Sequence, residues 1–189
     1  MKKNLYLFLL ALMPLSVSAY SLTRVSVHDP SIVWDNAGTY YVFGSHQAWA
    51  KSTDLMNWST VPVAWRTESN ASVTCETAFN VNATTSIKVG GANLDFKNGN
   101  GNPFDVEAYS AAGNASYDIS GNLWAPDVIW NPTMEKWCMY LSINGDNANC
   151  SIVLLTADNI EGPYLYQGPV VFSGFNLGST TLSYKYTDL

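Results

Sequence analysis

The stretch Val27-His28-Asp29-Pro30-Ser31-Ile32-Val33-Trp34 decides how the rest of the sequence is interpreted. Proline donates no ladder hydrogen bond and is confined to the first residues of strands, to edges and to bulges. The apolar run after Pro30 therefore predicts a strand that the chain enters abruptly from a loop. We expect the Asp29 carboxylate at the mouth of this strand to have a fixed direction and little water around it. It is either a group that does chemistry or an acceptor that caps a turn.

Two groups of short strands are predicted, each rich in β-branched and aromatic residues. The first contains residues 31–34, 40–45 and 49–52, which Asn, Asp and Gly turns separate. The second contains residues 124–130, 136–142 and 151–156. Helical periodicity is absent from the first group, so each group is predicted to form an antiparallel meander in an all-β protein.

The two groups are an internal repeat of a sheet with three or four strands. The repeat matches Trp34 with Trp130, Tyr40 with Trp137, Ser45 with Ser142, and Ser52-Thr53-Asp54 with Thr156-Ala157-Asp158. A repeated small antiparallel sheet is typical of the blades of a β-propeller.

The repeat also predicts where two aspartates lie. Pairing Trp34 with Trp130 places Asp127 opposite Ser31, two residues beyond the position of Asp29. Side chains alternate along a strand with a period of two, so both carboxylates are predicted to point the same way. In a propeller they would converge on one pocket near the central axis.

Two converging carboxylates favour acid/base hydrolysis of a sugar polymer, in which one group holds a proton and the other activates water. The seven Trp and eleven Tyr residues offer flat platforms for sugars, although core packing explains any single ring equally well. The structural alternative is that Asp29 and Asp127 only cap strand ends beside Pro30 and Pro126.

The first nineteen residues have the order of a secretory signal peptide. Lys2 and Lys3 precede an apolar run, and the segment ends in Val17-Ser18-Ala19. We expect a secreted or periplasmic protein with no membrane span after cleavage. Loss of the two lysines takes the formal net charge from −6 to −8, which makes nucleic acid an unfavourable partner.

Two other features bear on the organisation of the chain. Residues 66–122 are rich in Asn, Ser, Ala and Gly, and they are predicted to form a surface insertion between the two repeats. Cys138 and Cys150 lie in consecutive predicted strands and are candidates for a disulfide, while an odd cysteine count leaves one of the three unpaired.

Four motifs in order resemble those of the family-43 glycoside hydrolases, the arabinanase and xylosidase group. They are His28-Asp29-Pro30-Ser31-Ile32, then Gly38 to Ser45, then Ser52 to Trp58, then Leu123-Trp124-Ala125-Pro126-Asp127-Val128. The resemblance implies a five-bladed β-propeller, of which residues 20–189 would form about two blades. It also implies a glycosidase that hydrolyses O-glycosyl bonds in plant polysaccharides such as arabinan or xylan by an inverting mechanism.

The resemblance assigns roles to the two aspartates. Asp29 would be the general base that takes a proton from water, and Asp127 would tune and orient the general acid. In the family this acid is a glutamate of a later blade, before Pro and Tyr. Glu161-Gly162-Pro163-Tyr164 resembles that motif, but the repeat places it in a turn at the blade rim. The acid is therefore expected to be missing from these 189 residues, and the chain alone is expected to be poorly stable and inactive.

Other expectations concern ligands. His46, Trp49 and Trp124 are candidate sugar contacts, with core or rim packing as the alternative for each. The family often holds a cation, calcium, at the propeller axis through a histidine of a late blade, and no metal ligand is named among these residues. A non-catalytic glycan-binding module and a structural propeller are the competing functions.

Overall fold

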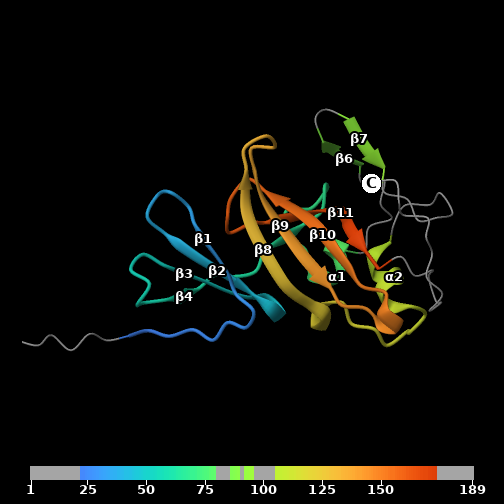
Figure 1. Ribbon diagram of the computed structural model, residues 1–189, viewed down its shortest axis with the longest axis horizontal. Helices are drawn as coiled ribbons and strands as arrows, with labels where there is room; N and C mark the ends of the chain where they lie inside the picture. The colour runs from blue at the N-terminus through green and yellow to red at the C-terminus, as the bar shows by residue number, and fades with distance from the viewer. Residues whose placement is uncertain (1–21, 80–85, 90–91, 96–104, 174–189) are drawn as a thin grey trace, which may run out of the picture.

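The computed structural model describes residues 22–79, 86–89, 92–95 and 105–173. The predicted signal peptide, residues 1–19, lies outside these residues. Strands are the main regular secondary structure of the described residues, and two sheets lie side by side, antiparallel except where β5 joins β11 (Figure 1). A separate hairpin joins β6 (Ser86–Val89) to β7 (Ala92–Asp95).

The first sheet is a four-stranded meander in chain order. It consists of β1 (Ser31–Trp34), β2 (Tyr40–Gly44), β3 (Ala48–Ser52) and β4 (Ser59–Thr60). A short 3-10 turn, η1 (Ser45–Gln47), connects β2 to β3. The three strands predicted from the sequence are confirmed.

The second sheet has five strands in the order β5-β11-β10-β9-β8. The predicted strands correspond to β8 (Leu123–Asn131), β9 (Lys136–Ile143) and β10 (Ser151–Ala157). Two strands were not predicted, namely β11 (Tyr164–Phe172) and the short β5 (Trp65–Arg66). Because β5 pairs in parallel with β11, the chain leaving the first sheet completes the outer edge of the second.

The pairing of β1 with β2 and of β8 with β9 confirms the internal repeat. Ser31 pairs with Phe43 in the first sheet, as Asp127 pairs with Tyr140 in the second. The third strands are offset, since Ser52 pairs with Tyr40 whereas the partner of Trp137 is Ala157. The predicted match of Ser52 with Thr156 was therefore wrong by one residue.

One hydrophobic core lies between the two sheets. The Trp49 ring is at its centre, with ring centroids of Phe43, Trp65 and Tyr164 at 5.2, 5.5 and 5.7 Å, all in edge-to-face geometry. The second sheet contributes buried residues that include Val128, Met139, Leu141, Val153 and Leu155. Burial of aromatic and aliphatic side chains from both sheets makes the two repeats one packed unit.

The segment 66–122 is more than a surface insertion. It contains the helices α1 (Cys75–Phe79) and α2 (Val106–Ala111), and Phe79 and Val106 are fully buried in the common core. Asp105 caps α2 by accepting the amide of Ala108. The prediction of a surface location was wrong for these parts because a few apolar residues among many polar ones were enough to anchor them.

The proposed cysteine pair does not form. Cys138 lies in the middle of β9, opposite Ile129 and Thr156, whereas Cys150 precedes Ser151, which pairs with Ile143. Five strand residues separate the two positions, about 17 Å at 3.3 Å per residue, while disulfides need Cα atoms within about 7 Å. All three cysteines are free. No helix within the described ranges has the length and apolarity to cross a membrane.

Candidate active site

Asp29 precedes β1 and is held by a buried serine. The Ser45 amide donates to the His28 carbonyl at 2.9 Å, and its hydroxyl donates to Asp29 Oδ2 at 2.9 Å. His28 Nδ1 lies 2.7 Å from the same carboxylate oxygen. The carboxylate direction is thus fixed, as predicted, by two polar partners.

The backbone at Asp29 is not extended. Its φ of 46° lies in the left-handed region, which aspartate tolerates better than most residues do. Strand alternation therefore does not extend to Asp29, and the prediction that alternation orients this side chain was wrong. The Asp29 side chain is also 43% exposed, so the expectation of little surrounding water was wrong for this chain.

Gly44 explains how the segment before Asp29 approaches β2 so closely. A Cβ atom on Gly44 would lie 2.2 Å from Val27 Cγ1 and 2.7 Å from the His28 carbonyl oxygen. Only glycine leaves room for this contact. Gly44 therefore lets the 27–28 backbone lie against β2, and Ser45 binds the His28 carbonyl and the Asp29 carboxylate.

Asp127 lies on β8 and contacts the first sheet directly. The Ser31 hydroxyl donates to Asp127 Oδ1 at 2.7 Å and accepts the Val128 amide at 3.3 Å. Because Ser31 follows Asp29 by two residues, the two carboxylates lie at the same end of neighbouring inner strands. Tyr140 is the cross-strand partner of Asp127, and its pKa is raised by burial, with smaller contributions from Cys138 and the Asp127 charge.

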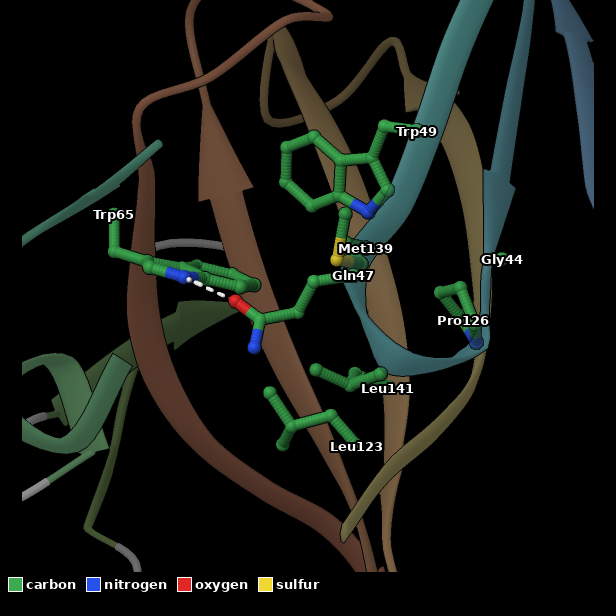
Figure 2. A pocket seen from close by; sticks show the side chains of 8 residues that line it. All are labelled: Gly44, Gln47, Trp49, Trp65, Leu123, Pro126, Met139 and Leu141. Atoms are coloured by element: carbon green, nitrogen blue, oxygen red, sulfur yellow. Dashed lines mark hydrogen bonds between the residues drawn. The ribbon is translucent and has the colours of Figure 1, made fainter. Parts of the chain in front are cut away.

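A small cavity lies at the seam between the sheets, next to this end of the strands. Figure 2 shows Gln47 directed into the seam, where its side-chain oxygen accepts the Trp65 indole N–H at 3.1 Å. The cavity volume is about 10 Å³, which is room for about one water molecule and far too small for a sugar.

The three predicted sugar contacts lie in different environments. His46 is exposed in η1, one residue after the clamp Ser45. Trp49 is only 4% exposed and packs in the core, so its ring is not open to a ligand. Trp124 is 41% exposed and lines an open groove of about 250 Å³, together with the polar residues Ser142, Asn144 and Ser151 and the apolar residues Ile152 and Val171.

Glu161 lies in the turn between β10 and β11, as the repeat predicted. Its Oε1 accepts from Lys51 Nζ at 2.7 Å and from the Tyr41 hydroxyl at 3.1 Å. Burial, followed by the hydrogen bond and charge of Glu161, raises the pKa of Tyr41 to about 12. These partners lie on the first sheet, so Glu161 links the two sheets and has no contact with Asp29 or Asp127 in the described hydrogen bonds.

Sequence reasoning did not single out Ser31 and Ser45 as residues that hold the carboxylates. The sequence contained a signal for each serine. Ser31 occupies the repeat position equivalent to Asp127, and Ser45 follows Gly44, where only glycine fits against the 27–28 backbone. Within the described ranges, no three or more His, Cys, Asp or Glu side chains are grouped to hold a metal ion.

Known proteins are similar to this chain in sequence and in structure, although no family model matches the sequence. The chain is 34% identical over 152 residues to the extracellular endo-α-(1→5)-L-arabinanase 2 of Bacillus subtilis, which covers 80% of this chain and 25% of that protein. It is 28% identical to the extracellular endo-α-(1→5)-L-arabinanase of Thermotoga petrophila, again over 25% of that protein. The chain thus spans about a quarter of the length of the curated relatives it matches.

Solved structures agree with these sequence matches. The family-43 glycoside hydrolase YxiA of Bacillus licheniformis is 35% identical with a TM-score of 0.50, over 82% of this chain and 28% of that one. The endo-1,5-α-L-arabinanase of Thermotoga petrophila has the same TM-score at 25% identity, over 85% and 29% of the two chains. The two sheets are therefore blades of the five-bladed β-propeller of these proteins. In sequence and in fold, the chain is similar to part of the family-43 glycoside hydrolases.

Proposed function

We propose that this chain forms two blades of the catalytic domain of an exported arabinan hydrolase. The observation that carries the proposal is the hydrogen bond from Ser31 to Asp127, because it joins the second carboxylate to the strand that Asp29 precedes. The names of the relatives support arabinan as the substrate and an extracellular location. A signal peptide at residues 1–19 agrees with that location.

The proposed reaction inverts the configuration of the anomeric carbon. Asp29 takes a proton from a water molecule as that water attacks the sugar, and a carboxylic acid protonates the leaving oxygen. Ser45 and His28 both contact Asp29 Oδ2, and they hold the base in one direction. The negative charge of Asp127 keeps a neighbouring carboxylic acid protonated, since like charges raise its pKa.

We propose that the general acid comes from a part of the protein beyond these 189 residues. Inverting enzymes separate acid and base by about 6.5–9.5 Å to leave room for water. Glu161 is the only motif match in the sequence, and it is bound to Lys51 and Tyr41 instead of facing Asp29. A chain that spans a quarter of its relatives leaves ample sequence for another glutamate.

Trp124 is the proposed sugar platform, because its exposed ring borders the groove beside Ser142 and Asn144. Aromatic faces pack well against the apolar faces of sugars while hydroxyl and amide groups take the sugar hydroxyls. His46 is a second proposed contact, since it is exposed beside Ser45. We do not propose Trp49 as a contact, because its ring is buried.

The test uses the protein that contains this chain together with its remaining sequence. We expect release of arabino-oligosaccharides from linear α-1,5-arabinan, with xylan as the alternative substrate. Asp29→Asn and Asp127→Asn should each lower kcat by about 100-fold or more. Asp158→Asn, which removes an exposed carboxylate bonded to Lys136 at the rim, is the matched control.

Three results would count against the proposal. Full activity of Asp29→Asn would show that Asp29 is not the general base. Retention of the anomeric configuration in the first products, measured by NMR, would exclude an inverting mechanism. Arabinan binding without turnover, unchanged in Asp29→Ala and Asp127→Ala, would favour the glycan-binding alternative. Export is tested separately, since N-terminal sequencing of the secreted protein should begin at Tyr20.

A further inference from the structure

Ser31 bridges the inner strands of the two blades through both functions of its hydroxyl. Its Oγ donates to Asp127 Oδ1 at 2.7 Å and accepts the Val128 amide at 3.3 Å. A hydroxyl has one donor and two acceptor lone pairs, so the donor is fully committed to the carboxylate. One side chain of β1 thereby contacts both the backbone and the acidic group of β8.

The hydrogen bond from Ser31 holds Asp127 Oδ1, and Asp127 Oδ2 has no hydrogen bond among the described residues. Asp127 is exposed, so without a partner its side chain would be free to rotate on the strand. A hydrogen bond to a charged acceptor is stronger than one between neutral groups and restricts the carboxylate direction. Ser31 is thus placed to orient the second oxygen.

Ser31 also relates the two carboxylates to each other. It lies two residues after Asp29, whose carboxylate is fixed independently by Ser45. Asp127, in contrast, belongs to the second sheet and meets the first sheet at this hydroxyl. The spacing between the two acidic groups therefore depends on the contact between Ser31 and Asp127.

We propose that Ser31 is a positioning residue that holds Asp127 in register with Asp29 across the blade interface. This inference rests on the proposed glycosidase function, in which Asp127 must face the general acid. Ser31 does not contact the substrate in this account. Its loss is expected to lower the rate of the chemical step while substrate binding stays close to normal.

The experiment compares Ser31→Val with Ser31→Thr in the protein that contains this chain and its remaining sequence. The two substitutions have nearly the same shape, and only threonine keeps the hydroxyl. Ser31→Val should lower kcat on arabinan by about tenfold or more with little change in KM, as expected for a lost hydrogen bond to a charged group. Ser31→Thr keeps the hydroxyl and should therefore stay within about threefold of the wild type.

Ser52→Val is the matched control for loss of stability. Ser52 has the same arrangement as Ser31, because its hydroxyl donates to Asp54 Oδ1 at 3.1 Å and accepts the Leu55 amide at 2.9 Å. It pairs with Tyr40 at the opposite end of the sheet. A lower melting temperature with unchanged kcat is expected for Ser52→Val, and a loss of kcat equal to that of Ser31→Val would overturn the inference.

The remaining outcomes separate this inference from the proposed function. Equal kcat values for Ser31→Val and Ser31→Thr would overturn the positioning role even if arabinan is hydrolysed. If the wild type hydrolyses no arabinan, the proposed function fails, and crystal structures of the two variants decide the positioning role. Displacement of the Asp127 carboxylate in the valine variant alone supports that role, and the same carboxylate position in both variants overturns it.

Discussion

Glu161 of the second sheet and Lys51 of the first form an ion pair, with Lys51 Nζ 2.7 Å from Glu161 Oε1. The Tyr41 hydroxyl donates to the same oxygen. The turn that carries Glu161 is therefore attached to the side of the neighbouring blade. This attachment explains an acidic residue before Gly-Pro-Tyr without any role in catalysis.

Glu161→Gln is expected to lower stability slightly and to leave kcat unchanged. The side chains of Glu161 and Lys51 are 33% and 40% exposed, so water screens the pair and its contribution is about 0.2–1 kcal/mol. Thermal unfolding and arabinan hydrolysis of the protein containing this chain measure the two effects. Lys51→Met should cause a similar loss, and the double variant should lose less than the sum. A 100-fold loss of kcat in a folded Glu161→Gln protein would instead restore Glu161 as the general acid.

Gly44→Ala is expected to displace Asp29, the proposed general base. The new Cβ would meet Val27 and the His28 carbonyl, which must move and take Asp29 with them. Overpacking of this kind costs about 1–3 kcal/mol. Both the melting temperature and kcat should fall. Gly121→Ala is the control, because its Cβ would be 3.6 Å from the nearest atom, an ordinary contact. Equal behaviour of the two variants would show that the 27–29 segment has room to adjust.

The repeated strands were predictable because each carries its own local signal. Short runs of β-branched and aromatic residues, separated by turns with Asn, Asp and Gly, predicted β1, β2 and β3 and their counterparts in the second blade. β5 was not predictable in this way, because two residues give no periodicity and its partner β11 lies about 100 residues away, beyond any local pattern. Tertiary pairing creates that strand.

The sequence predicted that Asp127 lies near the strand that follows Asp29, and it did not predict the local geometry of either carboxylate. The repeat placed Asp127 opposite Ser31, and the structure joins these residues by a hydrogen bond. The positive φ of Asp29 and the clamp by Ser45 come from a close approach of two segments, which strand alternation does not encode. Trp49 shows the same limit, since composition does not distinguish a core ring from a sugar platform.

Trp124→Ala and Trp49→Ala are expected to fail in different ways. Trp124 is exposed at the groove, so its loss should raise KM by about two- to tenfold, the value of one aromatic contact, with little change in melting temperature. Trp49 is in the core, so its loss should cost about 3–5 kcal/mol of stability. Steady-state kinetics and thermal unfolding distinguish the two. An unchanged KM for Trp124→Ala would show that the Trp124 ring does not contact the substrate.

Asp54→Asn is expected to destabilise the protein in a pH-dependent way. The Asp54 carboxylate accepts from the Asn57 side chain and from the amides of Asn57 and Met56, and these bonds lower its pKa below the usual 3.8. A depressed pKa gives stability that is present above the usual value and is lost as pH falls toward the folded value. The melting temperatures of wild type and variant should therefore differ clearly at about pH 7 and converge below about pH 4. A difference that stays constant with pH would exclude the carboxylate charge as its cause.

The outward face of the first sheet predicts how this chain behaves by itself. Ile32 and Trp34 share this face of β1, and they are 60% and 51% exposed. Blades of a propeller cover such faces with their neighbours, so the 189-residue chain alone should bind a hydrophobic dye and self-associate. Ile32→Lys should reduce self-association of this chain and lower the melting temperature of the protein with its remaining blades. If the substitution is neutral in the larger protein, no blade packs against this face, and the propeller arrangement would have to be revised there.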